Sequence, residues 1–463
     1  MRSAFAFRYH NSSKRIYMSN AKKMSWERLI SNKRLGMERY RSGTIQSRSD
    51  FQRDFDRLVF SSPFRRLQNK TQVFPLPGSI FVHNRLTHSL EVSSVGRSLA
   101  NEVSMQLLPR YKGTPAEERL PHMVEIVGAA CLAHDMGNPP FGHSGERTIA
   151  TYFSEGRGLS VKYRLTDEEW SDLVNFDGNA NSFRLLAHQF RGRREGGFAM
   201  TYSSLAAIVK YPYRSIDSEK KGKFGFFLSE AECFHTVAKE LGMIEKRPGV
   251  YARHPLVYLM EAADDICYQV MDIEDAHKLK ILTSRNVTEL FFGFFPEDKQ
   301  KKMQRVIDMI ADNNEKVAYM RSCVIGELVG ECARVFVENE DAILSGEFDG
   351  CLIDHISSLP HAGYKRCSKT AWDKIYNSSD VVDIELAGNQ IITFLLDRLL
   401  DAVLHPEKNY SQLLLSRVPS QYDTANPTLY GKIQAVLDHI SGMTDVYALD
   451  LFRKLNGLSL PAV

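Results

Sequence analysis

The chain lacks the features that define a secreted disulfide scaffold or a membrane protein. Its seven cysteines are scattered without a Cys-x-x-Cys pair, a pattern typical of reduced, packed thiols. No stretch reaches the ~18 consecutive apolar residues that a membrane helix needs. We therefore expect a cytoplasmic protein with no membrane partner.

An excess of charge of one sign is also missing. The 59 lysines and arginines nearly balance 56 acidic residues, which leaves a formal net charge of +3. A protein whose main task is coating nucleic acid would be far more basic, so any polyanionic ligand must be bound by a local cluster of cations. The first 26 residues contain no Asp or Glu. We expect residues 1–30 to form a basic tail, with a transit peptide or an upstream start as alternatives.

Strand-like alternation, internal repeats and long Gly/Ser linkers are scarce, whereas helical periodicity extends over most of the chain. The clearest case is 384–404, and the best strand candidate, 71–81, is interrupted by two prolines and a glycine. Further helices are predicted at 124–133, 183–190, 256–270 and 317–336, and loops at 191–197, 215–223 and 377–380. The sequence predicts an all-α fold, with a core at 31–280 and a helical C-terminal region at 281–463 in the same body.

The most informative segment is 133–146, AHDMGNPPFGHSGE. His134 and Asp135 end an apolar helix, which Gly137 and two prolines then stop. An imidazole beside a carboxylate can bind one divalent cation. Because a lone His-Asp pair occurs by chance in many proteins, its value depends on further ligands.

Two further ligand candidates lie far away in sequence. His88 opens a helix in RLTHSLEV, and Asp264 lies within the apolar stretch MEAADDICY. A carboxylate among apolar residues is costly unless it is paired or bound to metal. Taken singly, each residue is more simply a buried helix-end histidine or a capping aspartate. Together with His134 and Asp135 they supply two neutral and two anionic ligands for a divalent ion.

Helix geometry separates Asp264 from its neighbour Asp265. Asp264, Tyr268 and Asp272 are spaced i, i+4 and i+8, so they share one helix face. Asp265 points about 100° away from that face. We therefore expect Asp265 to be a supporting or solvated carboxylate.

The order His88, His134-Asp135, Asp264 resembles the metal-binding signature of the HD-domain phosphohydrolases. Longer strings are similar to bacterial deoxyguanosine triphosphate triphosphohydrolases, which cleave dNTPs to deoxynucleoside and inorganic triphosphate. These strings are SSPFRRLQNKTQVFPL, NRLTHSLEV, AHDMGNPPFGHSGE, the FDGNANSFR region and MEAADDICY. The resemblance covers residues 30–280, with a weaker echo in SGMTDVYALDLFRKL near the C-terminus. It implies an HD-domain helical core with one divalent ion, Mn²⁺ or Mg²⁺ first and Fe²⁺, Ni²⁺ or Zn²⁺ as alternatives.

His143 and Glu146 follow the stiff Pro-Pro turn. A His–carboxylate couple can relay the protons that phosphoester cleavage requires, and the resemblance implies that this pair is catalytic. The alternative for Glu146 is an ordinary carboxylate in the first turn of a helix, where the dipole favours it. The residue types alone do not show which of the two acts as acid, as base or as nucleophile.

A triphosphate needs specific cations and hydrogen-bond donors. The candidates for phosphate binding are Arg85, Asn179, Lys210, Tyr211 and Lys223. Gln72 and Asp272 are candidates for the 3′-hydroxyl, Tyr268 for the deoxyribose face, where a close ring excludes a 2′-hydroxyl, and the resemblance implies Val73 at the base. The simpler alternatives are solvated surface lysines and a core tyrosine.

The expected function is metal-dependent hydrolysis of dGTP or of dNTPs in general. One alternative is an HD-family phosphodiesterase or 5′-nucleotidase, and another is a non-enzymatic protein that binds dNTPs or single-stranded DNA. The resemblance further implies a homo-oligomer, with a hexamer favoured, and a single-stranded DNA or dNTP effector. Arg453 is a candidate to reach a neighbouring active site or an effector.

Overall fold

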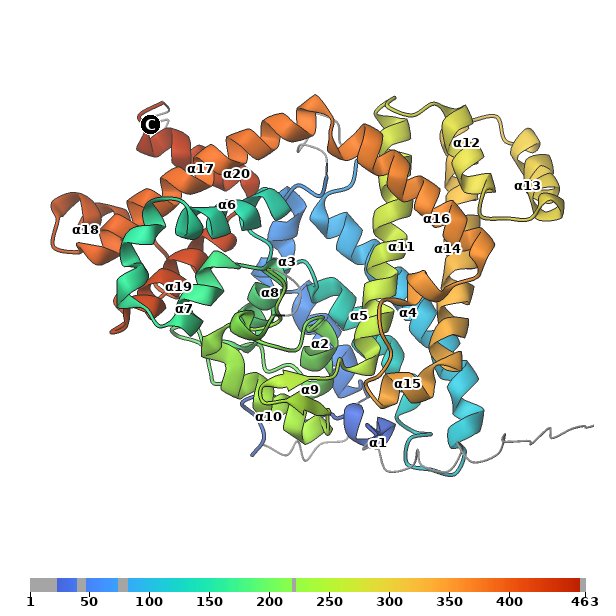
Figure 1. Ribbon diagram of the computed structural model, residues 1–463, viewed down its shortest axis with the longest axis horizontal. Coiled ribbons are helices and arrows are strands. Elements are labelled where there is room, and N and C mark those ends of the chain that lie inside the picture. Colours follow the sequence, from blue (N-terminus) through green and yellow to red (C-terminus); the bar gives the residue numbers. More distant parts are fainter. Residues whose placement is uncertain (1–22, 40–46, 74–81, 219–221, 459–463) are drawn as a thin grey trace, which may run out of the picture.

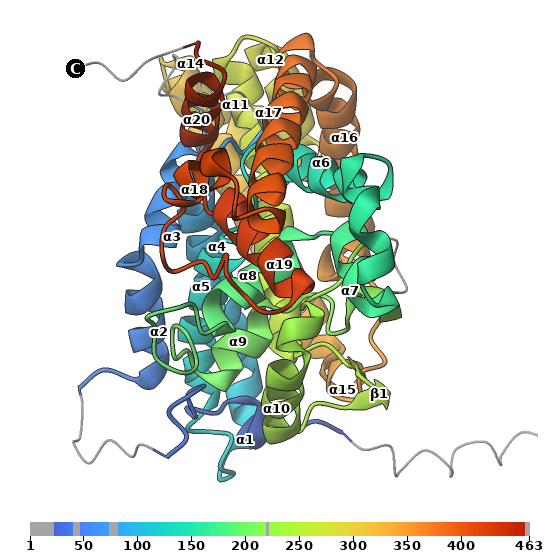
Figure 2. The same ribbon diagram turned by 90° about the vertical axis from the view of Figure 1, so that its left-hand side faces the viewer.

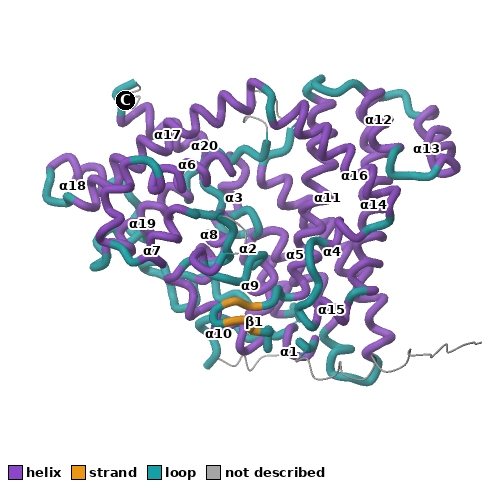
Figure 3. The backbone as a smooth tube through the Cα atoms, viewed as in Figure 1, coloured by secondary structure: helices purple, strands orange, loops and turns teal. Residues whose placement is uncertain are grey.

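The computed structural model describes residues 23–39, 47–73, 82–218 and 222–458 of the chain. These residues form helices almost throughout (Figures 1 and 3), which confirms the all-α prediction. The single sheet described is a short antiparallel hairpin of β1 (Glu245–Arg247) and β2 (Val250–Tyr251). No helix in the described ranges is both long and apolar enough to cross a membrane.

The α-helices are α1 (Trp26–Leu29), α2 (Asp50–Val59), α3 (Ser62–Arg66), α4 (Arg85–Leu107), α5 (Met123–Ala133), α6 (Gly142–Ser154), α7 (Asp167–Val174), α8 (Gly178–Ala187), α9 (Tyr202–Ile208), α10 (Ala231–Leu241), α11 (Pro255–Lys278), α12 (Ser284–Phe292), α13 (Glu297–Met309), α14 (Asn313–Glu338), α15 (Glu340–Leu344), α16 (Ser358–Ala371), α17 (Ser379–Leu404), α18 (Asn409–Leu415), α19 (Leu429–Ser441) and α20 (Asp445–Leu455). Short 3₁₀ turns cover Leu67–Asn69, Leu108–Tyr111, Leu120–His122, Arg157–Arg164, Ser215–Asp217, Leu228–Glu230 and Leu352–His355, and a π-helical turn covers Trp372–Tyr376.

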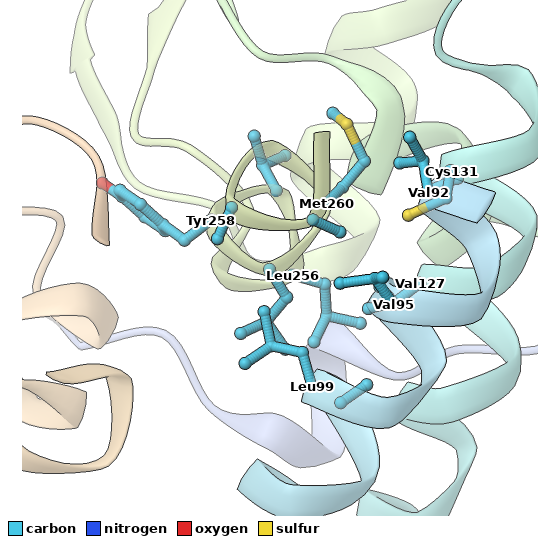
Figure 4. Close-up of a cluster of buried hydrophobic side chains, with 14 of the residues drawn as sticks. Val92, Val95, Leu99, Val127, Cys131, Leu256, Tyr258 and Met260 are labelled. Atoms are coloured by element: carbon cyan, nitrogen blue, oxygen red, sulfur yellow. The ribbon is translucent and has the colours of Figure 1, made fainter. Parts of the chain in front are cut away.

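Helices α4, α5 and α11 form the centre of the main core. Figure 4 shows apolar side chains of all three helices, with Tyr258 on a separate side of α11. The helices approach so closely that a Cβ added at Gly96 of α4 would lie 2.6 Å from the Cys131 sulfur of α5. Only glycine fits at such an approach. This packing holds the three helices in fixed register, and each carries a metal-ligand candidate.

A second apolar cluster joins α6 and α7 to the C-terminal helices α17, α19 and α20. Figure 1 shows α17 crossing the top of the molecule, and Figure 2 shows α19 running below it. Residues beyond 281 contribute to both clusters, because Val317 and Phe336 belong to the main core and Ile392 and Leu395 to the second. The C-terminal region therefore packs as part of one body with the N-terminal half.

The structure differs from the sequence prediction at several boundaries. The end of the expected basic tail is packed: Trp26 and Leu29 are buried, and the Trp26 indole donates to Glu340 Oε1 at 2.8 Å. The helix predicted at 183–190 begins at Gly178 and ends at Ala187, and α17 begins inside the loop predicted at 377–380. Of the strand candidate 71–81, residues 74–81 lie outside the described ranges, and Thr71 makes one isolated bridge to Asn84.

Candidate active site

Four side chains from three helices meet at the centre of the fold. His88 lies in the first turn of α4, His134 and Asp135 follow α5, and Asp264 lies in α11. Asp264 Oδ1 lies 3.1 Å from His88 Nε2 and 3.5 Å from His134 Nε2. The nearest ligand atoms of His88, His134 and Asp135 all lie within 4.8 Å of one another. His88, His134 and Asp135 are thus close enough to bind one cation, and Asp264 lies beside the two imidazoles.

The hydrogen bonds of His134 leave one nitrogen available for a metal. Its Nδ1 donates to the Cys131 carbonyl at 2.6 Å, so in the neutral ring Nε2 carries the lone pair. Nε2 is buried and has no hydrogen-bond partner among the described residues. Burial lowers the pKa of a histidine, but the carboxylates of Asp135 and Asp264 raise that of His134 to about 9. A divalent cation would satisfy this nitrogen and the carboxylates together, so the residues fit such an ion.

Asp135 is held from both sides. Arg85 Nη1 donates to its Oδ2 at 2.6 Å, and Asn138 Nδ2 donates to its Oδ1 at 2.6 Å. Burial alone would raise the pKa of Asp135, but the charges of Arg85 and His134 hold it well below the ordinary value. Arg85 is itself buried, and a Cβ at Gly142 would collide with its guanidinium at 2.3 Å. The glycine of the PFGH segment therefore makes room for this arginine.

His143 and Glu146 form a hydrogen-bonded pair at the start of α6. His143 Nδ1 lies 2.8 Å from Glu146 Oε2, and Glu146 Oε1 accepts from Gly178 N at 2.9 Å. The side chain of Glu146 is 8% exposed, whereas that of His143 is 63% exposed. The Glu146 charge raises the pKa of His143. The buried carboxylate thus orients an imidazole that reaches out into the site.

The turn before α6 has an unusual backbone that the C-terminal region supports. Phe141 and Gly142 both have positive φ, 62° and 57°. Phe141 N donates to Asp445 Oδ1 at 2.9 Å, and Thr71 N donates to Asp445 Oδ2 at 2.8 Å. A non-glycine residue at positive φ is strained and needs such support. Asp445 thus connects the C-terminal helix α20 to the turn that carries His143.

A cavity of about 480 Å³ opens beside these groups. It is lined by Gln72, Arg85, His134, Asp135, Asn138, His143, Glu146, Arg147, Asn179, Lys210, Tyr211, Lys223, Asp264 and Tyr268. Both lysines of this lining have acidic partners: Lys210 Nζ lies 3.0 Å from Glu261, and Lys223 Nζ lies 3.3 Å from Asp177. These two lysines and the two arginines, each with a carboxylate partner, line the cavity next to the ligand cluster.

One end of the cavity is closed by aromatic rings. Tyr268 stacks on Tyr376 with ring centroids 5.8 Å apart, and the Tyr376 hydroxyl donates to Asp272 Oδ2 at 2.5 Å. Burial raises the pKa of Asp272 to about 7. Gln72 Oε1 is buried without a hydrogen-bond partner in the described part of the chain. A sugar placed against Tyr268 would meet a flat apolar face, and Gln72 Oε1 offers an acceptor in the same lining.

Two family models match the chain. The HD domain matches residues 85–174, and the phosphohydrolase-associated domain matches residues 362–454. A deoxyguanosinetriphosphate triphosphohydrolase-like protein of Pseudomonas aeruginosa (strain LESB58) is 36% identical over 458 residues, covering 95% of this chain and 100% of that protein. A protein of the same name from Synechocystis sp. is also 36% identical and covers 94% of this chain and 100% of its own. A deoxyguanosinetriphosphate triphosphohydrolase of Yersinia enterocolitica is 30% identical, covering 88% of this chain and 93% of its own.

The chain belongs to the HD-domain deoxyguanosinetriphosphate triphosphohydrolase family. The resemblance stated from the motifs is thereby confirmed, and the protein is a phosphohydrolase of the HD type. HD domains bind divalent metals, and His88, His134 and Asp135 form the matching cluster in this member. Asp264 lies outside the HD match, on α11.

Most residues predicted from the sequence of this family member are brought together. Twelve of them line the cavity. His88 is not among the lining residues, but its Nε2 lies 3.1 Å from Oδ1 of Asp264, which is. Val73 and Asp272 are not among the lining residues: Val73 packs against the main core, and Asp272 is buried behind Tyr376. Asp265 does not line the cavity either, and burial raises its pKa to about 7.

Three residues of the site were missed by sequence reasoning. Asn138 lies within the motif that was singled out, and its hydrogen bond to Asp135 makes it a support of that carboxylate. Arg147 directly follows Glu146 and pairs with Glu385 of α17 through Nη2 and Oε1, 2.5 Å apart. Tyr376 is 104 residues from Asp272, and no local pattern marks it as part of the site.

Proposed function

We propose that this protein hydrolyses deoxynucleoside triphosphates to deoxynucleoside and inorganic triphosphate. The observation that carries the proposal is the single cavity that combines a metal-ligand cluster with Arg85, Arg147, Lys210 and Lys223. Phosphodiesters and monophosphates carry too little charge to need four cations. A triphosphate matches this number.

His88, His134, Asp135 and Asp264 would hold one divalent cation, for which we propose Mn²⁺ or Mg²⁺, with Fe²⁺, Ni²⁺ or Zn²⁺ as alternatives. When bound, such an ion lowers the pKa of water and neutralises charge on a phosphoryl oxygen. Arg85 keeps Asp135 ionised and oriented through their 2.6 Å contact. Its Nε is buried without a partner among the described residues, which leaves a donor for a phosphate oxygen.

His143 would move protons at the reacting centre. The Glu146 charge raises the pKa of His143, and the 2.8 Å contact with Glu146 favours the imidazolium form. An exposed imidazole ring at the cavity wall can protonate the 5′-oxygen of a leaving deoxynucleoside. Lys210, Lys223, Asn179 and Tyr211 would position the phosphates.

The aromatic end of the cavity would select the sugar. Tyr268 would lie against the deoxyribose, where a 2′-hydroxyl would meet its ring. Gln72 and Asp272 would hydrogen-bond the 3′-hydroxyl, and Tyr376 orients Asp272. Val73 would lie near the base.

The product profile tests this function. Each of the four dNTPs, alone and in mixture, is incubated with Mn²⁺ or Mg²⁺, and the phosphate product is identified by anion-exchange chromatography. Tripolyphosphate is expected. Pyrophosphate or orthophosphate would instead support an HD phosphodiesterase or 5′-nucleotidase, and no turnover under any condition would support a binding protein. His134→Ala is the inactive control for a contaminating phosphatase.

The proposed substrate is dGTP or dNTPs in general. We also propose a cytoplasmic location. We propose a homo-oligomer, a hexamer first, with single-stranded DNA or a dNTP as effector. Arg453 is exposed on α20 and is proposed to reach a neighbouring subunit or an effector. Light scattering of the purified protein with and without dNTP would measure the assembly.

A further inference from the structure

A second cavity, of about 180 Å³, adjoins the catalytic segment at Met136 but is lined by different residues. Its walls come from α3, α8 and the end of α19, and it is lined by Ser62, Pro63, Arg66, Lys70, Met136, Asn181, Leu185, Phe190, Arg193, Gln421, Tyr422, Asp438, Ser441 and Gly442. None of these residues lines the catalytic cavity. The cavity therefore needs an account of its own.

Two arginines in this cavity have no acidic partner in the part of the chain that the structure describes. Neither Arg66 nor Arg193 forms an ion pair or a side-chain hydrogen bond with any residue in the described ranges. Arg193 instead packs over the rings of Phe190 and Phe198, at 5.5 and 4.9 Å from their centroids. Burial lowers the pKa of both arginines, and the charge of Arg66 lowers that of Arg193 further. Two half-buried like charges facing one cavity repel each other unless an anion lies between them.

The acidic residue of the cavity is bound by a different arginine. Asp438 accepts from Arg184 at both oxygens, Nε to Oδ1 and Nη2 to Oδ2, each at 2.8 Å. Arg184 also pairs with Glu230 at 2.6 Å, so one guanidinium serves two carboxylates. Both oxygens of Asp438 are nevertheless directed at Arg184, and within the described residues no ion pair joins Asp438 to Arg66 or Arg193.

Two further polar groups line the cavity. Lys70 is fully buried, and its Nζ donates to two backbone carbonyls, those of Asn138 and of Ser441. Ser441 is 3% exposed, and its hydroxyl oxygen has no hydrogen-bond partner within the described residues. A ligand with several acceptor oxygens would satisfy this hydroxyl and both guanidinium groups.

We propose that the cavity of Arg66, Arg193 and Ser441 is a second anion site that binds a phosphate group. Guanidinium groups match phosphate oxygens in geometry and hold them with charge-assisted hydrogen bonds. The cavity is smaller than the ~300–1,000 Å³ typical of complete small-molecule sites. It therefore fits a phosphate group rather than a whole nucleotide.

A larger ligand would have room to extend from this group. A neighbouring cavity of about 740 Å³ shares the lining residues Phe190, Gln421 and Asp438. The shared chemistry is the phosphate, which is either free or part of a phosphate ester whose remainder lies along Phe190. The experiment below distinguishes these two sources.

Calorimetric titration with orthophosphate, in EDTA to remove metal, tests the site directly. The variant Arg66→Ala/Arg193→Ala is expected to lose one bound phosphate per chain, or to bind it at least tenfold more weakly. The matched control is Arg65→Ala/Arg194→Ala, which removes the exposed neighbours of the same two arginines and should bind as wild type does. Equal stoichiometry and affinity in both double variants and wild type would overturn the proposal.

A measurement on the unmodified protein covers the case in which a variant fails to fold. Phosphate should protect Arg66 and Arg193 from phenylglyoxal, as measured by peptide mass spectrometry, more than it protects Arg65 and Arg194. Equal protection of all four overturns the site. Repeating the titration with deoxyguanosine monophosphate identifies the source: tighter binding that depends on Arg66 and Arg193 indicates a phosphate ester, and equal or weaker binding indicates free phosphate.

Discussion

The Nδ1 atom of His143 lies 2.8 Å from Oε2 of Glu146, three residues further along α6. Since the second oxygen of Glu146 accepts from Gly178 N, the carboxylate is fixed and the exposed imidazole ring takes its orientation from it. A Cβ at Gly178 would lie 2.4 Å from that oxygen, so the close approach requires glycine. The pair is therefore built so that a buried anion controls a histidine facing the cavity.

Replacing His143 by Ala should lower kcat roughly 10²–10⁴-fold, the usual contribution of a positioned acid or base. Metal content, measured by mass spectrometry, should not change, because the four ligand candidates are untouched. His122→Ala is the matched control, since His122 and Glu125 have the same i, i+3 contact at 2.9 Å outside the catalytic cavity. A loss of metal in the His143 variant would contradict the proposed role.

Glu146→Gln should shift the pH profile of kcat/KM. The Glu146 charge raises the pKa of His143, so removing it returns that pKa toward the ordinary histidine value. If His143 acts as an acid, activity falls as pH rises through its pKa, and this limb moves to lower pH in the variant. If His143 acts as a base, activity rises as pH rises through its pKa, and this limb also moves to lower pH in the variant. An unmoved limb would assign the titration to another group.

Asp264 and Asp265 provide a paired test of the metal site. Asp264→Ala should lower divalent-cation affinity at least tenfold and abolish turnover, because it removes the oxygen 3.1 Å from His88 Nε2. Asp265→Asn should retain metal and most activity, since Asp265 lies outside the cavity lining. Isothermal titration with Mn²⁺ measures the first effect. The reverse order of damage would show that Asp265 is the ligand.

Much of this site could be predicted from sequence because its chemistry is concentrated in continuous strings. The segment 133–146 contains His134, Asp135, His143 and Glu146, and helical periodicity is enough to place Asp264 and Tyr268 on one face. The helical fold followed from the same periodicity.

The remainder depended on contacts that no local pattern encodes. Tyr376 reaches Asp272 from a π-helical turn 104 residues away, and Asp445 supports a turn 304 residues before it. The hydrogen bond from the Trp26 indole to Glu340 is equally non-local. The sequence around Trp26 therefore gave no sign that this short segment is helical and packed. Such pairs are set by packing and not by propensity.

Tyr376→Phe should weaken sugar recognition while leaving the fold intact. The change removes the hydroxyl that donates to Asp272 and keeps the ring stacked on Tyr268. An unpaired buried carboxylate costs about 1–3 kcal/mol, and we expect kcat/KM for dNTPs to fall about tenfold. Discrimination against ribonucleotides should fall too. Lys374→Ala, on the same turn but exposed, serves as control, and equal kinetics in both variants would remove Tyr376 from the site.

His254 should make the protein less stable in mild acid. It is fully buried at the start of α11, its Nδ1 accepts from Leu256 N, and burial lowers its pKa to about 4. A depressed pKa gives stability that is present above the unfolded value of about 6.5 and is lost as pH falls toward 4. The titration of His254 should lower the free energy of unfolding by about 2 kcal/mol between pH 7 and pH 5.

Urea unfolding of His254→Asn checks this, because Asn can still cap the helix but does not titrate. The variant should show a pH dependence smaller by about that amount. The exposed His405→Asn is the control and should follow wild type. An unchanged pH dependence in His254→Asn would mean that other groups, such as the buried His439, account for it.

Asp445→Asn tests whether the C-terminal region positions the catalytic turn. Each carboxylate oxygen of Asp445 accepts from a backbone N–H, one of Phe141 and one of Thr71. An Asn amide can accept only one of these bonds, so the variant leaves one buried donor unpaired, at a cost of about 1–3 kcal/mol in unfolding free energy. Because Phe141 has positive φ and precedes His143, kcat should fall more than KM changes. The half-exposed Asp450→Asn is the control on the same helix. A variant that is destabilised but turns over dNTP at the wild-type rate would show that Asp445 serves the fold and not the position of His143.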